Sequence, residues 1–138
     1  KTKAWFEQAI PEPTDKQKCI QVGCHAEEFG EMLDALGDNT VSHIVHKLAD
    51  EYKSADKALA TYLTLATGQH KDLLDSLVDQ IVTAVGVAHM YGFDIEGALA
   101  EVNRSNFSKF EDGKPVFDDN GKIAKGKGYT PPELGRFI

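Results

Sequence analysis

The sequence predicts an all-α protein, a four- to five-helix bundle with a short C-terminal β-hairpin or extended tail. Two observations carry this prediction. Apolar residues recur at three- and four-residue intervals over most of 14–106, the spacing of buried helical stripes. Glycine, proline and cap-forming residues separate the periodic segments. We expect a single domain over 1–138, with a helical bundle over 1–110 and the hairpin and tail over 111–138.

Three helices are expected in the N-terminal half. A short one stops at Pro11–Pro13, because proline lacks the N–H that a helix interior needs. A second is capped by Thr14 and ends at Gly37. A third is capped by Thr40 and runs over about 41–66. The expected inward residues are Trp5, Phe6 and Ala9 in the first helix, Val22, Ala26, Phe29, Leu33 and Leu36 in the second, and Ile44, Leu48, Tyr52, Ala55, Leu59, Tyr62 and Leu63 in the third.

Two further helices and an irregular end complete the prediction. A fourth helix over about 71–91 has a wide apolar face and stops at Gly92. A fifth covers about 95–106. An Asn120-Gly121 turn then predicts a small hairpin over 116–124. The expected inward residues are Leu74, Leu77, Val78, Ile81, Val85 and Ala88 in the fourth helix, and Ala98, Leu99 and Val102 in the fifth.

Charge and composition exclude several classes of function. The formal net charge of −7 repels nucleic-acid polymers. No apolar run reaches the roughly 20 residues that cross a bilayer, and the first residues do not look like a leader peptide. We therefore expect a cytoplasmic protein without a membrane partner, in which Cys19 and Cys24 are reduced. No phosphate-binding Gly-x-x-x-x-Gly-Lys loop is present.

One cluster of carboxylates lies in the middle of the second expected helix, in the run Glu27-Glu28-Phe29-Gly30-Glu31. Glu28 and Glu31 are three residues apart and share a face, where like charges slightly destabilise a helix. Gly30 costs up to about 1 kcal/mol relative to alanine. Its missing side chain is expected to leave room for a metal ion or a phosphate.

A second cluster lies on the fourth expected helix, where Asp75 and Asp79 share a face at the four-residue spacing and Asp72 precedes them. Divalent cations such as Mg²⁺ take oxygen ligands, so two carboxylate pairs on facing helices would suit a metal site in a bundle. The spacing alone fits solvated acidic faces as well, since such pairs are common on exposed helix surfaces.

The acidic motifs resemble those of a known superfamily. Residues 25–31, His-Ala-Glu-Glu-Phe-Gly-Glu, look like the Glu-Glu-x-x-Glu helix of the MazG-like all-α nucleotide pyrophosphohydrolases, and 75–82 resembles the second metal-binding helix of that superfamily. The segments 101–110, 112–117 and 125–129 are similar to its bacterial and bacteriophage branch often labelled phosphoribosyl-ATP pyrophosphohydrolase-like. One position departs from the pattern, since serine replaces glutamate three residues before Asp79.

The resemblance implies hydrolysis of a nucleoside triphosphate to its monophosphate and pyrophosphate, with Mg²⁺ or alternatively Mn²⁺ as the metal. The substrate would be a standard, deoxy or modified nucleotide, as in nucleotide-pool housecleaning. Water would attack between the α and β phosphorus atoms. Glu27 would add a ligand or orient this water, and Lys109 would stabilise the departing pyrophosphate. The implied metal ligands are Glu28, Glu31, Asp75 and Asp79; the implied catalytic residues are Glu27, Glu31 and Lys109; the implied substrate-binding residues are Asn103, Asn106 and Lys109.

The resemblance also implies a homodimer or a dimer of dimers, in which a second subunit covers the apolar face of the fourth helix. Two other functions stay open: phosphoribosyl-ATP hydrolysis in histidine biosynthesis, and a non-catalytic helical module that binds a nucleotide or a partner protein. Lys109 and Arg104 also fit an ordinary role as surface cations near a helix C-terminus. Trp5 fits packing better than base stacking.

Overall fold

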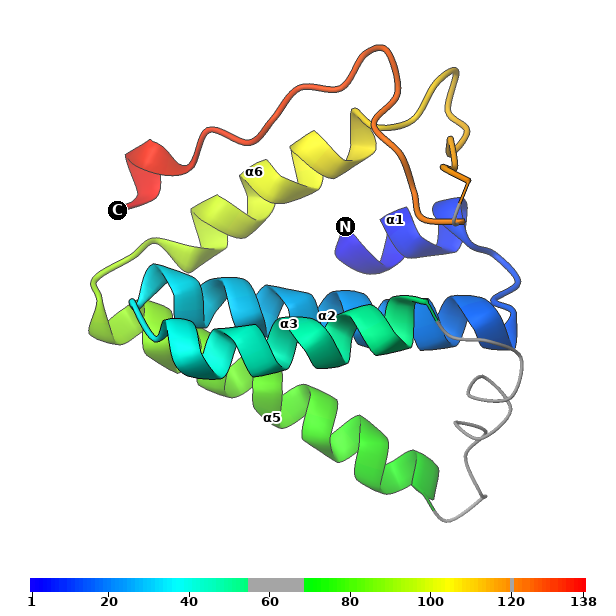
Figure 1. Cartoon of the computed structure of the whole chain (residues 1–138). Helices are drawn as coiled ribbons and strands as arrows, with labels where there is room; N and C mark the ends of the chain where they lie inside the picture. The colour runs from blue at the N-terminus through cyan, green and yellow to red at the C-terminus, as the bar shows by residue number, and fades with distance from the viewer. Residues whose placement is uncertain (55–68, 120) are drawn as a thin grey trace. The chain divides into compact units, whose positions relative to one another are not determined.

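The computed structural model describes residues 1–54, 69–119 and 121–138. Its regular elements are helices, which confirms the predicted all-α class (Figure 1). The chain forms two compact units: unit 1 is Lys1–Pro11 with Leu65–Ile138, and unit 2 is Glu12–Thr64. The described helices of unit 1 are α1 (Thr2–Ala9), α5 (Gln69–Met90), α6 (Ile95–Phe107) and the 3-10 helix η1 (Leu134–Phe137), and those of unit 2 are α2 (Asp15–Ala35) and α3 (Asn39–Lys53).

Local sequence signals define both ends of α2. The Thr14 hydroxyl accepts a hydrogen bond from the Gln17 backbone N–H (3.2 Å), and the Gln17 side chain accepts one from the Thr14 N–H (2.9 Å). This capping box satisfies two N–H groups that lack partners within the helix. At the other end, Gly37 adopts a φ of +84°, which ends the helix as predicted.

The start of α3 differs from the prediction. The Asp38 carboxylate accepts a hydrogen bond from the Val41 N–H (3.3 Å), so Asp38 is the N-cap and the helix begins at Asn39. The prediction that Thr40 caps this helix is therefore wrong. The helix ends at Lys53, and the part of the predicted helix over 55–66 lies outside the described residues.

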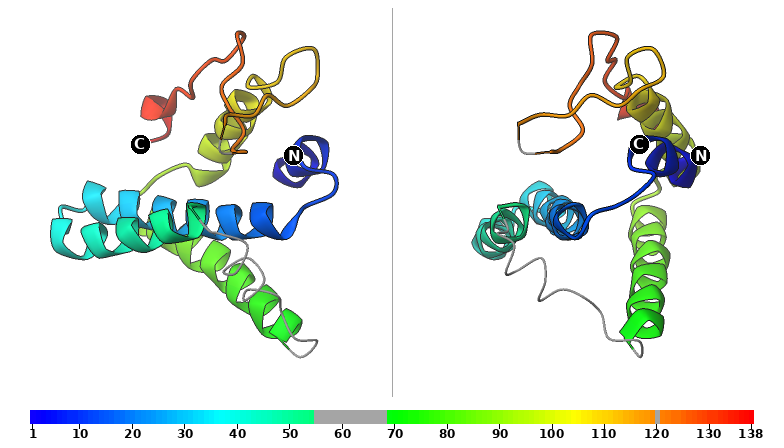
Figure 2. Two further views of the ribbon diagram at one scale, coloured as in Figure 1. Left: turned by 45° about the vertical axis from the view of Figure 1, so that its right-hand side comes forward. Right: turned by 90° about the vertical axis from the view of Figure 1, so that its right-hand side faces the viewer.

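Small side chains bring α2 and α3 together, and the two helices lie side by side in both views of Figure 2. A Cβ atom on Gly23 would lie 2.8 Å from the Ala49 carbonyl oxygen and 2.9 Å from the Lys53 nitrogen. Glycine at this position therefore permits a close approach of the two backbones. Cys19 and Ala49 are fully buried, and Ser42 is 2% exposed.

Several large apolar residues in the described part of unit 2 are exposed, contrary to the predicted stripes, although Ile20 is buried. On α2, Val22, Phe29 and Leu36 are 46%, 51% and 54% exposed. On α3, Ile44 and Leu48 are likewise exposed. These five predicted inward positions were wrong because the closest approach of the two helices is made at glycine and other small residues, which a search for large apolar side chains does not detect.

The short helix α1 packs through the face that the sequence predicts. Trp5 and Ala9 are buried, and the helix ends before Pro11 as predicted. The Trp5 ring stacks on Phe110, with ring centroids 5.8 Å apart and planes 7° from parallel. Stacked aromatic pairs stabilise a contact beyond the area that they bury, so this pair fixes α1 to the segment that follows α6.

Helix α5 is apolar and largely exposed. It ends at Met90, and the φ of +77° at Gly92 matches the predicted stop. Within this helix, all of which the structure describes, Ala88 alone is buried. By length and composition α5 is able to cross a bilayer. Asp75 and Asp79 lie on this helix, and each would cost about 2.5–3.5 kcal/mol at a bilayer centre.

Helix α6 buries polar residues, contrary to the prediction. Leu99 is exposed, and Ala98 and Val102 are only partly covered. The C-terminal tail covers the polar side of this helix by hydrogen bonding. The buried side chains of α6 are Glu101, Asn103 and Ser105.

The predicted β-hairpin is not confirmed. In the described residues after α6, strand-like pairing is limited to two isolated antiparallel bridges. Asp112 and Gly113 have φ angles of +50° and +73°, which is typical of the type I′ turn that Asp-Gly pairs favour. Asn120 of the predicted turn lies outside the described residues. The two bridges join Glu111 to Lys114 and Phe117 to Ile123.

Candidate metal and phosphate site

The predicted site residues fall in both units, and each set is described within its own unit. In unit 2, Glu28 and Glu31 are exposed and share one face of α2. The face of α2 that contacts α3 includes Gly23, Glu27 and Gly30, which recur at the helical spacing. Contact with α3 therefore leaves the face of Glu28 and Glu31 accessible.

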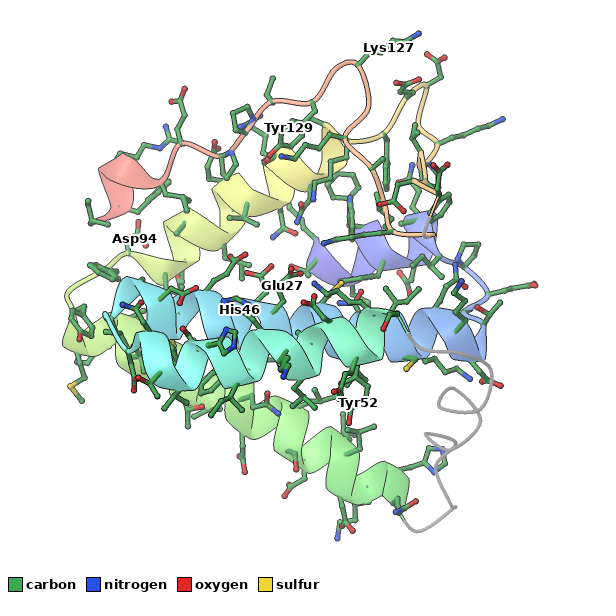
Figure 3. The ribbon with its side chains drawn as sticks, viewed as in Figure 1. Glu27, His46, Tyr52, Asp94, Lys127 and Tyr129 are labelled. Carbon is green, nitrogen blue, oxygen red and sulfur yellow. The ribbon has the colours of Figure 1, made fainter. Side chains whose placement is uncertain are left out.

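Glu27, whose side chain is labelled in Figure 3, joins α2 to α3 by an ion pair with Lys53. Its carboxylate accepts a hydrogen bond from the Lys53 ammonium at 2.7 Å, and the two side chains are 25% and 23% exposed. Lys53 also contacts Asp50 at 3.1 Å. The hydrogen bond from Lys53 to Glu27 is the main cause that raises the pKa of Lys53.

Gly30 accommodates His46 rather than a ligand. A Cβ atom on Gly30 would lie 2.8 Å from Cε1 of the His46 ring. The ring is held by Asp34, whose Oδ2 lies 2.8 Å from Nε2 of His46. A hydrogen bond with Ser42 and a second with His46 lower the pKa of Asp34. The prediction that Gly30 leaves room for a metal ion or a phosphate is therefore wrong.

In unit 1, Asp75 and Asp79 are exposed on α5 and share a face at the four-residue spacing. Paired carboxylate oxygens on helices are the donor type that Mg²⁺ prefers, so the chemistry of Glu28, Glu31, Asp75 and Asp79 fits this ion. Over 1–54, 69–119 and 121–138, no three His, Cys, Asp or Glu side chains gather closely enough to hold a metal.

Asn103 is buried on α6, and its side-chain amide has two partners in unit 1. The amide oxygen accepts a hydrogen bond from the Thr2 hydroxyl at 3.0 Å. The amide nitrogen donates to the Leu99 carbonyl at 2.8 Å. These bonds satisfy polar groups that burial would otherwise leave without partners, and they tie α6 to α1.

Asn106 and Lys109 lie at the C-terminal end of α6, close to Trp5. The Trp5 indole N–H donates to the Asn106 carbonyl at 2.8 Å. The Lys109 ammonium lies 5.7 Å from the centroid of the Trp5 ring, within the range of a cation–π contact. Both side chains are partly exposed, as a direct contact with substrate would require.

A buried ionic network on α6 was not anticipated from the sequence. The Glu101 carboxylate accepts hydrogen bonds from Nε (2.9 Å) and Nη2 (2.8 Å) of Arg104 and from the Glu133 backbone N–H (3.0 Å). These bonds, those from Arg104 first, lower the pKa of Glu101 to about 2. Arg104 also donates to the Thr130 hydroxyl (2.6 Å) and the Pro131 carbonyl (3.0 Å). A Glu and an Arg three residues apart on one helix are the signal for such a pair.

Comparison with protein-family models, with curated proteins and with solved structures finds no match to this chain.

Proposed function

We propose that this chain is a metal-dependent nucleoside triphosphate pyrophosphohydrolase of the MazG-like type. The observation that supports the proposal most is the division of α2 into two faces. The contacting face, with Gly23, Glu27 and Gly30, meets α3, whereas Glu28 and Glu31 lie beside it and are exposed. Like charges at this spacing destabilise a helix slightly, and a bound cation would remove that cost.

The proposal assigns metal binding to Glu28, Glu31, Asp75 and Asp79. Bound Mg²⁺ supplies charge neutralisation at phosphate oxygens and a lowered pKa for coordinated water. Glu27 would orient the attacking water, a role that needs an ionised carboxylate able to accept a hydrogen bond. The Glu27 carboxylate lies 2.7 Å from the Lys53 ammonium, which would hold it in place.

The phosphate chain is assigned to the end of α6. Lys109 would stabilise the negative charge that develops on the departing pyrophosphate, and the Asn106 amide would donate to a phosphate oxygen. Asn103 is buried, and its amide is bonded to Thr2 and Leu99. Its contribution to the proposed site is therefore to hold α6 against α1.

The test is pyrophosphate release with Mg²⁺ from a panel of standard, deoxy and modified nucleoside triphosphates and from phosphoribosyl-ATP. Glu31→Gln should abolish release, because an amide is a poor ligand for a hard cation. Glu51→Gln is the matched control, since Glu51 is an exposed glutamate on α3. It should retain the wild-type rate.

Each outcome of this panel selects one function. Release lost in Glu31→Gln but kept in Glu51→Gln supports the hydrolase, and the best substrate separates pool housecleaning from histidine biosynthesis. Release from no substrate by a folded protein favours the non-catalytic nucleotide-binding or partner-binding module. In that case Ser76→Glu, which restores the usual glutamate of the superfamily, is the next variant to assay.

We also propose that the protein is a homodimer or a dimer of dimers. The support is the apolar surface of α5, where Leu74, Ile81 and Val82 are exposed. Exposed apolar surface of this extent is typical of interaction sites. Sedimentation velocity at micromolar concentration should give at least the mass of a dimer, and a monomer would exclude the proposal.

A further inference from the structure

The three residues that the resemblance implies for substrate binding, Asn103, Asn106 and Lys109, all contact α1. The Thr2 hydroxyl donates to the Asn103 amide oxygen at 3.0 Å. The Trp5 indole N–H donates to the Asn106 carbonyl at 2.8 Å, and the Trp5 ring lies under the Lys109 ammonium at 5.7 Å. Two residues one turn apart on α1 therefore contact three positions along α6 and its end.

The orientation of Trp5 is set by several contacts at once. Its ring stacks on Phe110 and meets the edge of Phe6, with centroids 5.8 Å and 4.9 Å away, and the residue is buried. The Asn106 carbonyl that it binds also accepts the Lys109 backbone N–H at 3.1 Å. Trp5 therefore contacts the turn from which the Lys109 side chain extends.

We propose that Trp5 is a positioning residue for phosphate binding, which acts by orienting Asn106 and Lys109 toward an anionic polyphosphate. This inference rests on the phosphate-binding part of the proposed function and does not depend on metal binding. The attraction between a partly exposed ammonium and an aromatic face is weak compared with a charge-assisted bond to phosphate. The Lys109 ammonium therefore leaves the Trp5 ring when a phosphate chain binds.

Trp5 is the only tryptophan in the sequence, so tryptophan emission reports on this position alone. Titration of the full chain with sodium tripolyphosphate in EDTA should produce a saturable change in emission, with parallel binding in isothermal calorimetry. Lys109→Gln should remove the change, because neither the cation over the ring nor its charge is then present.

Trp5→Phe keeps an aromatic ring under Lys109 but loses the hydrogen bond to Asn106. Its calorimetric affinity for tripolyphosphate should fall about fivefold, the factor that corresponds to one hydrogen bond. Gln8→Ala is the matched control on the same helix. It removes the 2.6 Å bond to the Gly113 carbonyl without touching Asn106 or Lys109, and its affinity should equal that of the wild type.

Three results would overturn the inference: no binding by the wild type, binding without a change in Trp5 emission, or equal affinity losses in Trp5→Phe and Gln8→Ala. The last would show that α1 acts only through the stability of unit 1. Because the titration contains neither metal nor a hydrolysable nucleotide bond, its failure is separate from a failure of pyrophosphate release. A chain that binds tripolyphosphate through Trp5 and Lys109 yet hydrolyses nothing would retain this inference and lose the proposed enzyme.

Discussion

Replacement of Gly23 by alanine should destabilise unit 2, although alanine is the better helix former. The new Cβ atom would lie 2.8 Å from the Ala49 carbonyl oxygen, 2.8 Å from Cγ of Lys53 and 2.9 Å from the Lys53 nitrogen. Two of these three atoms belong to the backbone of α3 and cannot move without the helix. The substitution therefore requires α2 and α3 to separate.

The net effect combines two opposing terms. Extra carbon atoms in a packed contact cost about 1–3 kcal/mol, and the backbone contacts at Gly23 place this variant in the upper part of that range. Better helix propensity offsets up to about 1 kcal/mol, so the expected net loss is about 1–2 kcal/mol. At Gly86, in α5, a Cβ atom would meet nothing within 4 Å. Gly86→Ala should therefore gain about 0.5–1 kcal/mol.

The assay is urea unfolding followed by far-ultraviolet circular dichroism for the wild type and both variants. The structure requires changes of opposite sign in the free energy of unfolding, separated by about 1.5–3 kcal/mol. If Gly23→Ala stabilises the chain as Gly86→Ala does, the close approach of α2 and α3 is absent in solution. The account of the close contact at small residues between α2 and α3 would then be wrong.

Three further predictions follow from ionisable groups. The pKa of Glu101 lies near 2 in the folded chain, below its ordinary value of 4.5. The stabilisation from its network should be complete above about pH 4.5 and be lost as the pH falls toward 2. In urea unfolding at pH 7, 4 and 3, Glu101→Gln should lose less stability with acid than the wild type, and equal losses would refute the assignment. Lys53→Met removes the partner of Glu27 and should lower the free energy of unfolding by about 0.5–1.5 kcal/mol, as measured by thermal unfolding. Lys47→Met, on the exposed side of α3, should leave it unchanged. Burial raises the pKa of the Cys19 thiol, which donates to the Tyr52 carbonyl at 3.4 Å. Cys19 should therefore react with iodoacetamide more slowly than the partly exposed Cys24. Mass spectrometry of samples taken over time would measure the two rates.

Helix positions were predictable because their signals are local. The Thr14 cap, the left-handed Gly37 and Gly92, and the Pro11 break each act within a few residues of the chain, and each is found where the sequence places it. The N-cap of α3 was misplaced because Asp38 and Thr40 are both capable caps. Sequence alone did not decide between them.

Helix faces were harder to predict, because contact partners are distant in sequence. Gly23 and Gly30 lie seven residues apart on one face of α2, where they admit the α3 backbone and the His46 ring. Glu101 is buried because the tail supplies donors more than 25 residues later, as the bond from the Glu133 N–H shows. A search for large apolar residues assigns such glycines and carboxylates to the surface. The seven-residue glycine spacing is the signal that could have revealed the α2–α3 contact.

The two cations near the end of α6 differ in the partners that the structure gives them. Both lie where the helix dipole favours positive charge, and the sequence left both between a surface role and a site role. The Arg104 guanidinium donates hydrogen bonds to Glu101, Thr130 and Pro131. Binding of a phosphate by Arg104 would therefore break its bonds to the tail. Lys109 lies past the last helical residue, over the ring of Trp5. A phosphate-binding role at Arg104 would therefore release the tail, whereas the same role at Lys109 would require its ammonium to move away from the Trp5 ring.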